Sequence, residues 1–199
     1  MGNKLFLLIG KSASGKDSVY SLLLQRFEGK LIGVTPYTTR PMRQDETDGL
    51  EYFFVSNQKF AAMKAKGKVL ESRTYNTVCG KWTYFTADDG QIDLAKSSVL
   101  MIATPQMCLE LKKSSFGDSI VPLYIEVEDE ERLMRAIWRE RRQSTPNYAE
   151  VCRRYLADEQ DFAPEVLEKI GIEKKYYNWK LVACAKMVGD DIERVMESK

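Results

Sequence analysis

The chain has 199 residues, of which 44% are hydrophobic and 30% are charged, a composition ordinary for one globular domain with a single core. Lysine and arginine total 30 against 29 aspartate and glutamate, so no global charge favours nucleic acid or an anionic membrane. The sequence has no histidine, and its four cysteines lack CxxC spacing. This argues against a zinc site and a histidine general base, and favours free thiols in a reducing cytoplasm.

The first 35 residues follow the order strand, loop, helix, strand. Residues 4–9 are a continuous apolar run, as expected for a parallel strand buried on both faces. The run is too short to cross a membrane, and we expect neither a leader peptide nor a membrane span. Apolar side chains between residues 20 and 27 recur at helical spacing, and residues 31–35 predict the second strand. This order is typical of the opening of a doubly wound α/β fold.

The loop between that strand and helix matches a phosphate-binding loop except at Asp17, where the pattern has serine or threonine. Its glycines let backbone amides curl around an anion, and the start of the helix adds partial positive charge. Lys16 is placed to reach the terminal phosphates of a nucleotide. We predict that the nucleotide-binding residues of this loop are Gly10, Ser12, Ala13, Ser14, Gly15, Lys16, Asp17 and Ser18.

The pattern changes at residues 36–92, where short aromatic and β-branched runs alternate with glycine-containing turns. Such spacing predicts hairpins, together with one helix at 57–66. We interpret this region as an inserted, mostly β lobe. The predicted strands are 52–55, 69–73 and 83–86, and the turn signals are 48–49, 79–80 and 89–90.

A polar cluster near the start of this lobe predicts a second phosphate site. Arg40 and Arg43 lie three residues apart in an extended segment, so both guanidinium groups can converge on one phosphate with bidentate donors. A tyrosine hydroxyl, such as that of Tyr52, can complete the shell. Alternatively, the two arginines are solvated surface charges paired with Asp45 and Glu46.

The α/β pattern resumes at residue 93. A helix is predicted to begin at Thr104-Pro105, where an N-cap residue precedes proline at the first helical position. The remaining predicted elements are strands at 99–103, 120–127 and 176–177, helices at 129–142 and 147–161, a short helix after 163–164, and a terminal helix that includes 192–196.

With these residues in view, the chain resembles the guanylate kinase family of P-loop nucleoside monophosphate kinases. The family pattern TTRxxR, followed by Glu, Gly, Tyr and a strand ending in Phe-Val, is present at residues 38–55. The resemblance covers almost the whole chain. It implies an α/β fold, with a P-loop NTPase-like parallel sheet flanked by helices, an inserted monophosphate-binding lobe and a helical lid. The core would be 1–35 and 93–199, the lobe 36–92 and the lid about 136–154.

The resemblance also implies an activity, the transfer of the γ-phosphoryl group of ATP to GMP or dGMP with Mg²⁺. Glu71 and Thr86 would face the purine, and Asn178 would close the adenine pocket. Lys16 would act in catalysis with three lid arginines that neutralise charge on the transferring phosphoryl group. The implied phosphate ligands of the acceptor are Arg40, Arg43, Tyr52 and Tyr84, and the implied lid arginines are Arg135, Arg139 and Arg154.

The lid arginines also admit a plainer interpretation. They belong to a series that recurs at helical spacing, in which Glu128 with Arg132 and Glu131 with Arg135 would form i,i+4 ion pairs. On that interpretation the series is a solvated helix face.

Departures from the family pattern leave base specificity and the metal site open. The strand at 99–104 lacks the acidic residues that support magnesium and guanine in the family, and Pro36-Tyr37 replaces a serine. Our hypothesis is that Asp17, in the slot of the missing hydroxyl, supports Mg²⁺. The alternative is that Asp17 only favours the start of the helix electrostatically.

Two other functions remain open. The run Ser14-Gly15-Lys16-Asp17-Ser18 also resembles the loop of phage-type deoxynucleoside monophosphate kinases, so the acceptor would be another nucleotide or a sugar phosphate. A non-catalytic guanylate-kinase-like module that binds a phosphopeptide is the alternative outside enzymes. We expect a cytoplasmic monomer or homodimer whose partners are small-molecule nucleotides, with no nucleic acid or membrane among them.

Overall fold

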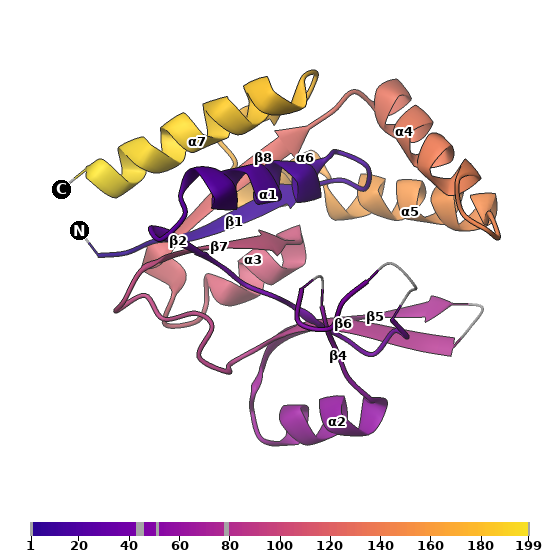
Figure 1. Ribbon diagram of the computed structural model, residues 1–199, viewed down its shortest axis with the longest axis horizontal. Helices are drawn as coiled ribbons and strands as arrows, with labels where there is room; N and C mark the ends of the chain where they lie inside the picture. Colours follow the sequence, from indigo (N-terminus) through magenta and orange to yellow (C-terminus); the bar gives the residue numbers. More distant parts are fainter. Residues whose placement is uncertain (1, 43–45, 51, 78–79, 199) are drawn as a thin grey trace.

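The structure is a computed structural model that describes residues 2–42, 46–50, 52–77 and 80–198. Within these residues the chain forms two separate sheets, one of five strands and one of four (Figure 1). The larger sheet is flanked by helices, which confirms the predicted α/β class with a parallel sheet. No helix in the described part of the chain is both long enough and apolar enough to span a bilayer.

The larger sheet is parallel and has the strand order β2-β7-β1-β8-β9. Every residue of its central strand is buried, as the apolar run predicted. Because all strands of this sheet run in parallel, the loop that follows β1 emerges at the carboxyl edge, where ligands of open α/β sheets bind. The strands are β1 Leu5–Gly10, β2 Leu31–Gly33, β7 Ser98–Ala103, β8 Ile120–Glu126 and β9 Lys175–Tyr177.

Helices cover both faces of this sheet, and alternate residues of β1 enter two different cores. Phe6 and Leu8 pack with α1 (Lys16–Arg26) and α7 (Leu181–Glu197), which lie together on one face in Figure 1. The β1 side chains that point to the other face of the sheet pack with the helices there, α3 (Pro105–Leu111) and α6 (Pro164–Lys169). Burial on both faces fixes the position of β1 and of the loop that leaves it.

The smaller sheet has the strand order β4-β3-β6-β5, and all of its described strands fall between residues 37 and 87. β5 and β6 form the predicted antiparallel hairpin. The predicted turn signal at 48–49 does not mark a hairpin between β3 and β4, because these two strands pair in parallel. Residues 39–52 are long enough for such a pairing, since a parallel connection needs roughly a dozen residues or more. The elements are β3 Tyr37–Thr38, β4 Phe53–Phe54, α2 Asn57–Ala65, β5 Val69–Thr77 and β6 Gly80–Ala87.

Two further helices, α4 (Asp129–Arg141) and α5 (Tyr148–Asp161), extend from the larger sheet and pack against each other. They match the predicted helices at 129–142 and 147–161. In Figure 1, α5 lies above the β5–β6 hairpin. An ion pair between Arg73 on β5 and Asp161 at the end of α5 joins the small sheet to this helical region. A 3₁₀ turn, Gly117–Ser119, precedes β8.

Candidate functional site

The loop between β1 and α1 has the backbone geometry of an anion cradle. Ala13 and Gly15 have positive φ angles of 64° and 79°, which turn the chain back onto the start of α1. Close packing requires the glycines. A Cβ on Gly15 would lie 2.5 Å from the Asn178 side-chain nitrogen, and one on Gly10 would lie 2.7 Å from the Ser14 hydroxyl. The loop therefore directs the free amides of the first helical turn toward the site of an anion.

The side chain of Asn178 holds this loop in place. It is 3% exposed, and its Nδ2 donates to the carbonyl oxygen of Ser14 at 2.8 Å. Its own amide donates to the Glu126 carbonyl oxygen at 2.9 Å, which ties it to the end of β8. Arg135 donates to the Asn178 carbonyl oxygen at 3.0 Å. The residue expected at the adenine pocket thus also positions the phosphate loop.

An ion-pair network centred on buried Arg132 and Asp158 links the loop to α4 and α5, and we call it the Arg132 latch. The Ser12 amide donates to Asp158 Oδ2 at 2.8 Å, and the same oxygen accepts from Arg132 at 3.2 Å. Arg132 is 2% exposed and lies over the Tyr155 ring. It donates as well to carboxylates of Asp129 at 2.9 Å and Glu159 at 2.7 Å, and Lys11 donates to Glu159 at 2.7 Å.

The latch revises two expectations from the sequence. The Ser12 amide, assigned to the ATP phosphates, has a protein carboxylate as its partner. Arg132 is not on a solvated helix face, and it pairs with Asp129 instead of Glu128. Helical spacing alone does not show which face of α4 packs against α5, so Asp158 was not found from the sequence.

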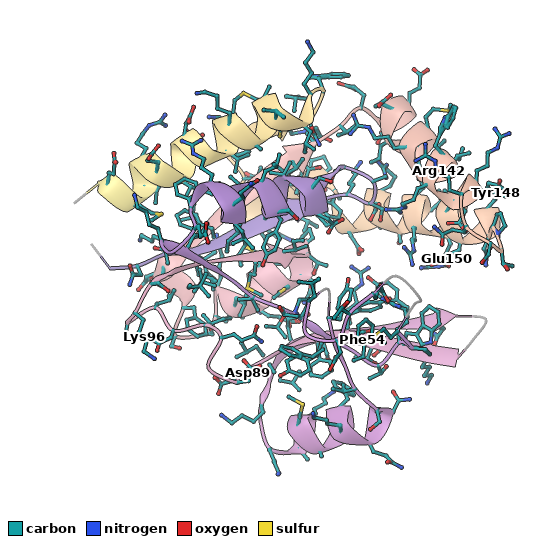
Figure 2. The ribbon with its side chains drawn as sticks, in the orientation of Figure 1. Phe54, Asp89, Lys96, Arg142, Tyr148 and Glu150 are labelled. Atoms are coloured by element: carbon teal, nitrogen blue, oxygen red, sulfur yellow. The ribbon has the colours of Figure 1, made fainter. Side chains whose placement is uncertain are left out.

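The three predicted lid arginines have different surroundings. Arg135 reaches the loop through Asn178, and it also forms the predicted ion pair with Glu131 at 2.8 Å. Arg139 is exposed and forms no ion pair with a described residue. Arg154 pairs with Glu150, which Figure 2 places at the outer end of the two helices together with Arg142 and Tyr148.

Glu150 is held ionised at that outer end. Hydrogen bonds from Arg153, and then from Arg154, hold the pKa of Glu150 at about 2. Arg153 also lies over the ring of Tyr75 on β5, at 5.6 Å. The outer end of α4 and α5 therefore contacts the small sheet. Part of the arginine series that recurs at helical spacing also lies at this end.

The second predicted phosphate site is centred on Arg40, which is 4% exposed. Its two terminal nitrogens donate to the two carboxylate oxygens of Glu46 at 2.8 and 2.7 Å. Its guanidinium lies over the rings of Tyr52 and Phe54, and the Tyr52 ring packs edge-on against Tyr84. Arg40 is therefore buried and not solvated, although it does form the pair with Glu46 that the alternative interpretation expected. Arg43 and Asp45 lie outside the described residues.

Asp17 is exposed at the start of α1. Burial raises the pKa of Tyr52 to about 12, and the charge of Asp17 contributes in the same direction after neighbouring Tyr84. The Asp17 carboxylate is therefore close enough to Tyr52, beside Arg40, to act on it electrostatically. Within the described residues, no three histidine, cysteine or acidic side chains gather as a metal site, so a cation here would also need phosphate or water oxygens.

Glu71 and Thr86 lie opposite each other on β5 and β6, and the Thr86 hydroxyl donates to Glu71 at 3.3 Å. Burial raises the pKa of Glu71 to about 7, and the charge of Glu110 on α3 adds to this effect. Glu71 lines a cavity of 220 Å³ between β5, α3 and the end of α5. The lining residues are Glu71, Ser72, Arg73, Thr104, Gln106, Glu110 and Asp161.

Sequence reasoning missed Gln106 and Glu110 in this cavity. The family pattern has acidic residues at the end of the strand at 99–104. In this chain Thr104 stands there and caps α3 by accepting a hydrogen bond from the Met107 amide at 3.2 Å. The available signal was the four-residue spacing of Gln106 and Glu110, which places both on one face of a helix. A larger cavity of 540 Å³ lies beside β8, β9 and α6 and contains none of the predicted site residues.

The fold and the loop define the class first: this is an α/β protein with a phosphate-binding loop at the carboxyl edge of a parallel sheet. The family model described as guanylate kinase matches residues 2–178. The chain therefore belongs to the guanylate kinase family. A solved guanylate kinase from Anaplasma phagocytophilum superposes with a TM-score of 0.70 at 17% identity, covering 100% of this chain and 88% of that one.

Curated relatives match over shorter segments. A guanylate kinase from Nitrosomonas europaea is 44% identical over 68 residues, which cover 34% of this chain and 33% of that protein. One from Thermotoga maritima is 33% identical over 114 residues, which cover 57% of this chain and 53% of that protein. The matched segments thus span about a third to a half of the length of these relatives.

Proposed function

We propose that this chain is an ATP-dependent nucleoside monophosphate kinase that transfers the γ-phosphoryl group of ATP to GMP or dGMP. The observation that supports the proposal is that the charge of Asp17, which follows the loop after β1, acts on Tyr52, whose ring lies against buried Arg40. Membership of the guanylate kinase family and the names of the curated relatives support this activity.

ATP would bind through the phosphate loop. The loop amides, among residues 10–18, and the Lys16 side chain would bind the phosphates, and Asn178 would hold the loop in shape while bordering the adenine site. Ser12 would help to hold the shape of the phosphate loop instead of donating its amide to ATP, since that amide donates a hydrogen bond to Asp158. Backbone donors fixed before the substrate arrives stabilise charge without reorganisation during the reaction.

The monophosphate would bind through the lobe. Its phosphate would replace Glu46 as the bidentate partner of Arg40, with Arg43 and the hydroxyls of Tyr52 and Tyr84 completing the shell. Its base would lie toward Glu71 and Thr86. No general base is required, because the acceptor phosphate is already an oxyanion.

Lid closure would bring the remaining cations to the transferring phosphoryl group. Arg135 is already beside the loop through Asn178, whereas Arg139 and Arg154 lie farther along α4 and α5. We propose that residues 136–154 move as a lid relative to a core of 1–35 and 93–199 and to the lobe of 36–92. Such closure excludes water and completes the set of charges that stabilise the transition state.

Asp17 would hold Mg²⁺ together with phosphate oxygens. The cation would supply charge neutralisation for the polyphosphate. The carboxylate fits that role, because it is exposed at the start of α1 and acts electrostatically on Tyr52 across the site. Magnesium titrations of Asp17→Asn test it. We expect the Mg²⁺ concentration for half-maximal turnover to rise, and an unchanged magnesium profile would leave Asp17 with only a helix-start role.

A panel of monophosphates tests the activity. Purified protein with Mg²⁺ and ATP is given GMP, dGMP, AMP, dTMP and sugar phosphates in turn, and ADP release is measured. We expect GMP and dGMP to be turned over fastest. Turnover of another acceptor with both guanine nucleotides inert would favour the related kinase function. Lys16-dependent ATP binding with no turnover of any acceptor would favour the phosphopeptide-binding module.

The setting of the enzyme is part of the same proposal. We infer a cytoplasmic protein, monomeric or homodimeric, whose partners are ATP and the acceptor nucleotide. Light scattering on the purified protein measures the oligomeric state.

A further inference from the structure

The cavity between β5 and α3 is lined by two carboxylates, those of half-buried Glu71 and exposed Glu110. Glu71 comes from the small sheet, and Glu110 comes from α3 of the core, where the Gln106 side-chain amide donates to it at 2.8 Å. The Glu110 charge acts on Glu71, since it is one of the causes, after burial, of the raised pKa of Glu71. A ligand that donates hydrogen bonds to both walls would relieve this repulsion.

The position of the cavity makes it the place for the acceptor base. Glu71 and Thr86 share one face of the β5–β6 hairpin with Tyr84, whose ring packs against Tyr52 in the Arg40 site. A nucleotide whose phosphate lies at Arg40 would therefore extend its base along this face. At 220 Å³ the cavity is smaller than the roughly 300–1,000 Å³ of pockets for drug-sized ligands, which suits a single base.

Guanine presents the matching pattern of donors. Its N1–H and exocyclic 2-amino group lie side by side, and the two amino hydrogens diverge, so this group can donate to carboxylates on opposite walls. Adenine places an acceptor at N1 and offers only its 6-amino group as a donor on that edge. Arg73, which also lines the cavity and pairs with Asp161, adds a donor group for base acceptor atoms.

We propose that Glu110 is a specificity-determining residue that accepts a hydrogen bond from the 2-amino group of guanine, opposite Glu71. Glu110 thereby supplies from α3 the carboxylate that the end of β7 lacks. Gln106 is a positioning residue, because its amide orients Glu110. The inference rests on the proposed function, since it takes the cavity as the site of the acceptor base.

The test compares GMP with inosine monophosphate, which differs only by lacking the 2-amino group. Binding of each is measured by calorimetry for wild type, Glu110→Ala and Glu110→Gln, with turnover recorded separately. A hydrogen bond to a charged partner corresponds to about 10- to 100-fold in affinity, so wild type should prefer GMP by that factor. Glu110→Ala should lose most of the preference with inosine monophosphate binding unchanged, and Glu110→Gln should be intermediate. Exposed Glu165→Ala on α6 is the matched control.

Each outcome separates this inference from the proposed function. Glu110-dependent selectivity without turnover would support the inference and contradict the kinase activity. Turnover of GMP with equal binding of the two nucleotides by wild type, or with selectivity unchanged in Glu110→Ala, would overturn the inference and leave the kinase activity standing. Failure of wild type to bind GMP would overturn both.

Discussion

The two proposed phosphate sites are built by different means. The loop after β1 relies on backbone geometry, and residues distant in sequence hold it, with Asn178 bonded to Ser14 and Asp158 bonded to Ser12. The Arg40 site relies on a side chain whose partner, Glu46, is six residues away. The first site is therefore set by the core, whereas the second is assembled within the lobe. The difference predicts that changes in each site affect one substrate more than the other.

The largest effect is expected at the phosphate loop. Lys16→Met removes the one side-chain cation of the loop that would reach the transferring phosphoryl group. We expect kcat to fall by about 10³-fold, the scale of losing one preorganised stabilising group. Steady-state kinetics measure it, with exposed Lys30→Met as the control. A fall of less than tenfold would mean that this loop is not the site of the chemistry.

The next effect is expected in the lobe. Arg40→Lys keeps the charge but removes the bidentate geometry, so we expect kcat/KM for the monophosphate to fall by about 10- to 100-fold. The KM for ATP should stay within about twofold of wild type. Arg194→Lys, on the exposed face of α7, is the control. Equal changes for both substrates would show that the two sites are not separate.

A pH effect is expected from Glu71. Its pKa of about 7 leaves the carboxyl largely protonated below neutrality, with Glu110 and Arg73 as the nearby charged groups. Accepting hydrogen bonds from guanine requires the ionised form, so binding releases a proton. GMP affinity should fall as pH decreases from 8 to 6, approaching tenfold per unit below pH 7. Glu71→Gln removes the titrating carboxyl group, whereas the substrate phosphate still ionises. Calorimetry on this variant should therefore give a flatter dependence of GMP affinity on pH. An identical slope in both proteins would assign the effect to the phosphate.

The smallest effects come from a matched pair on α5. Asp158→Ala breaks the Arg132 latch under the phosphate loop, and Asp161→Ala breaks the Arg73 contact with the lobe. We expect Asp158→Ala to cost about 2 kcal/mol of unfolding free energy, because a buried arginine and an amide lose a partner. Asp161 is partly exposed, and its loss should cost less than about 1 kcal/mol.

The same pair should separate the substrates in kinetics. Asp158→Ala should raise the KM for ATP a few-fold, and Asp161→Ala should raise the KM for the monophosphate. Denaturant unfolding and steady-state kinetics measure the two effects. Interchanged effects on the two KM values would contradict the assignment of one contact to each site.

The fold was largely predictable from local patterns. The apolar run of β1, the Thr104-Pro105 start of α3 and the helical periodicities of α4 and α5 each specify an element without reference to distant residues. The parallel pairing of β3 with β4 was not predictable in this way, because a glycine turn signal indicates a change of direction but not which strands become neighbours.

The site was predictable where a motif encodes it and not where packing creates it. The loop ending at Lys16 and the arginine in the lobe follow from residue spacing. The Arg132 latch depends on how α4 packs against α5, and Glu110 meets Glu71 only because α3 lies against β5. These contacts join residues from separate elements, so sequence periodicity specifies neither partner.

The central claim is that the two phosphate sites face each other across one reaction site. A dinucleotide in which adenosine and guanosine are joined through five phosphates would occupy both sites at once. Calorimetry should show it binding at least about 100-fold more tightly than ATP or GMP alone, because joining the two ligands makes the second binding event intramolecular. Lys16→Met and Arg40→Lys should each weaken it. Binding no tighter than that of ATP alone would contradict the account.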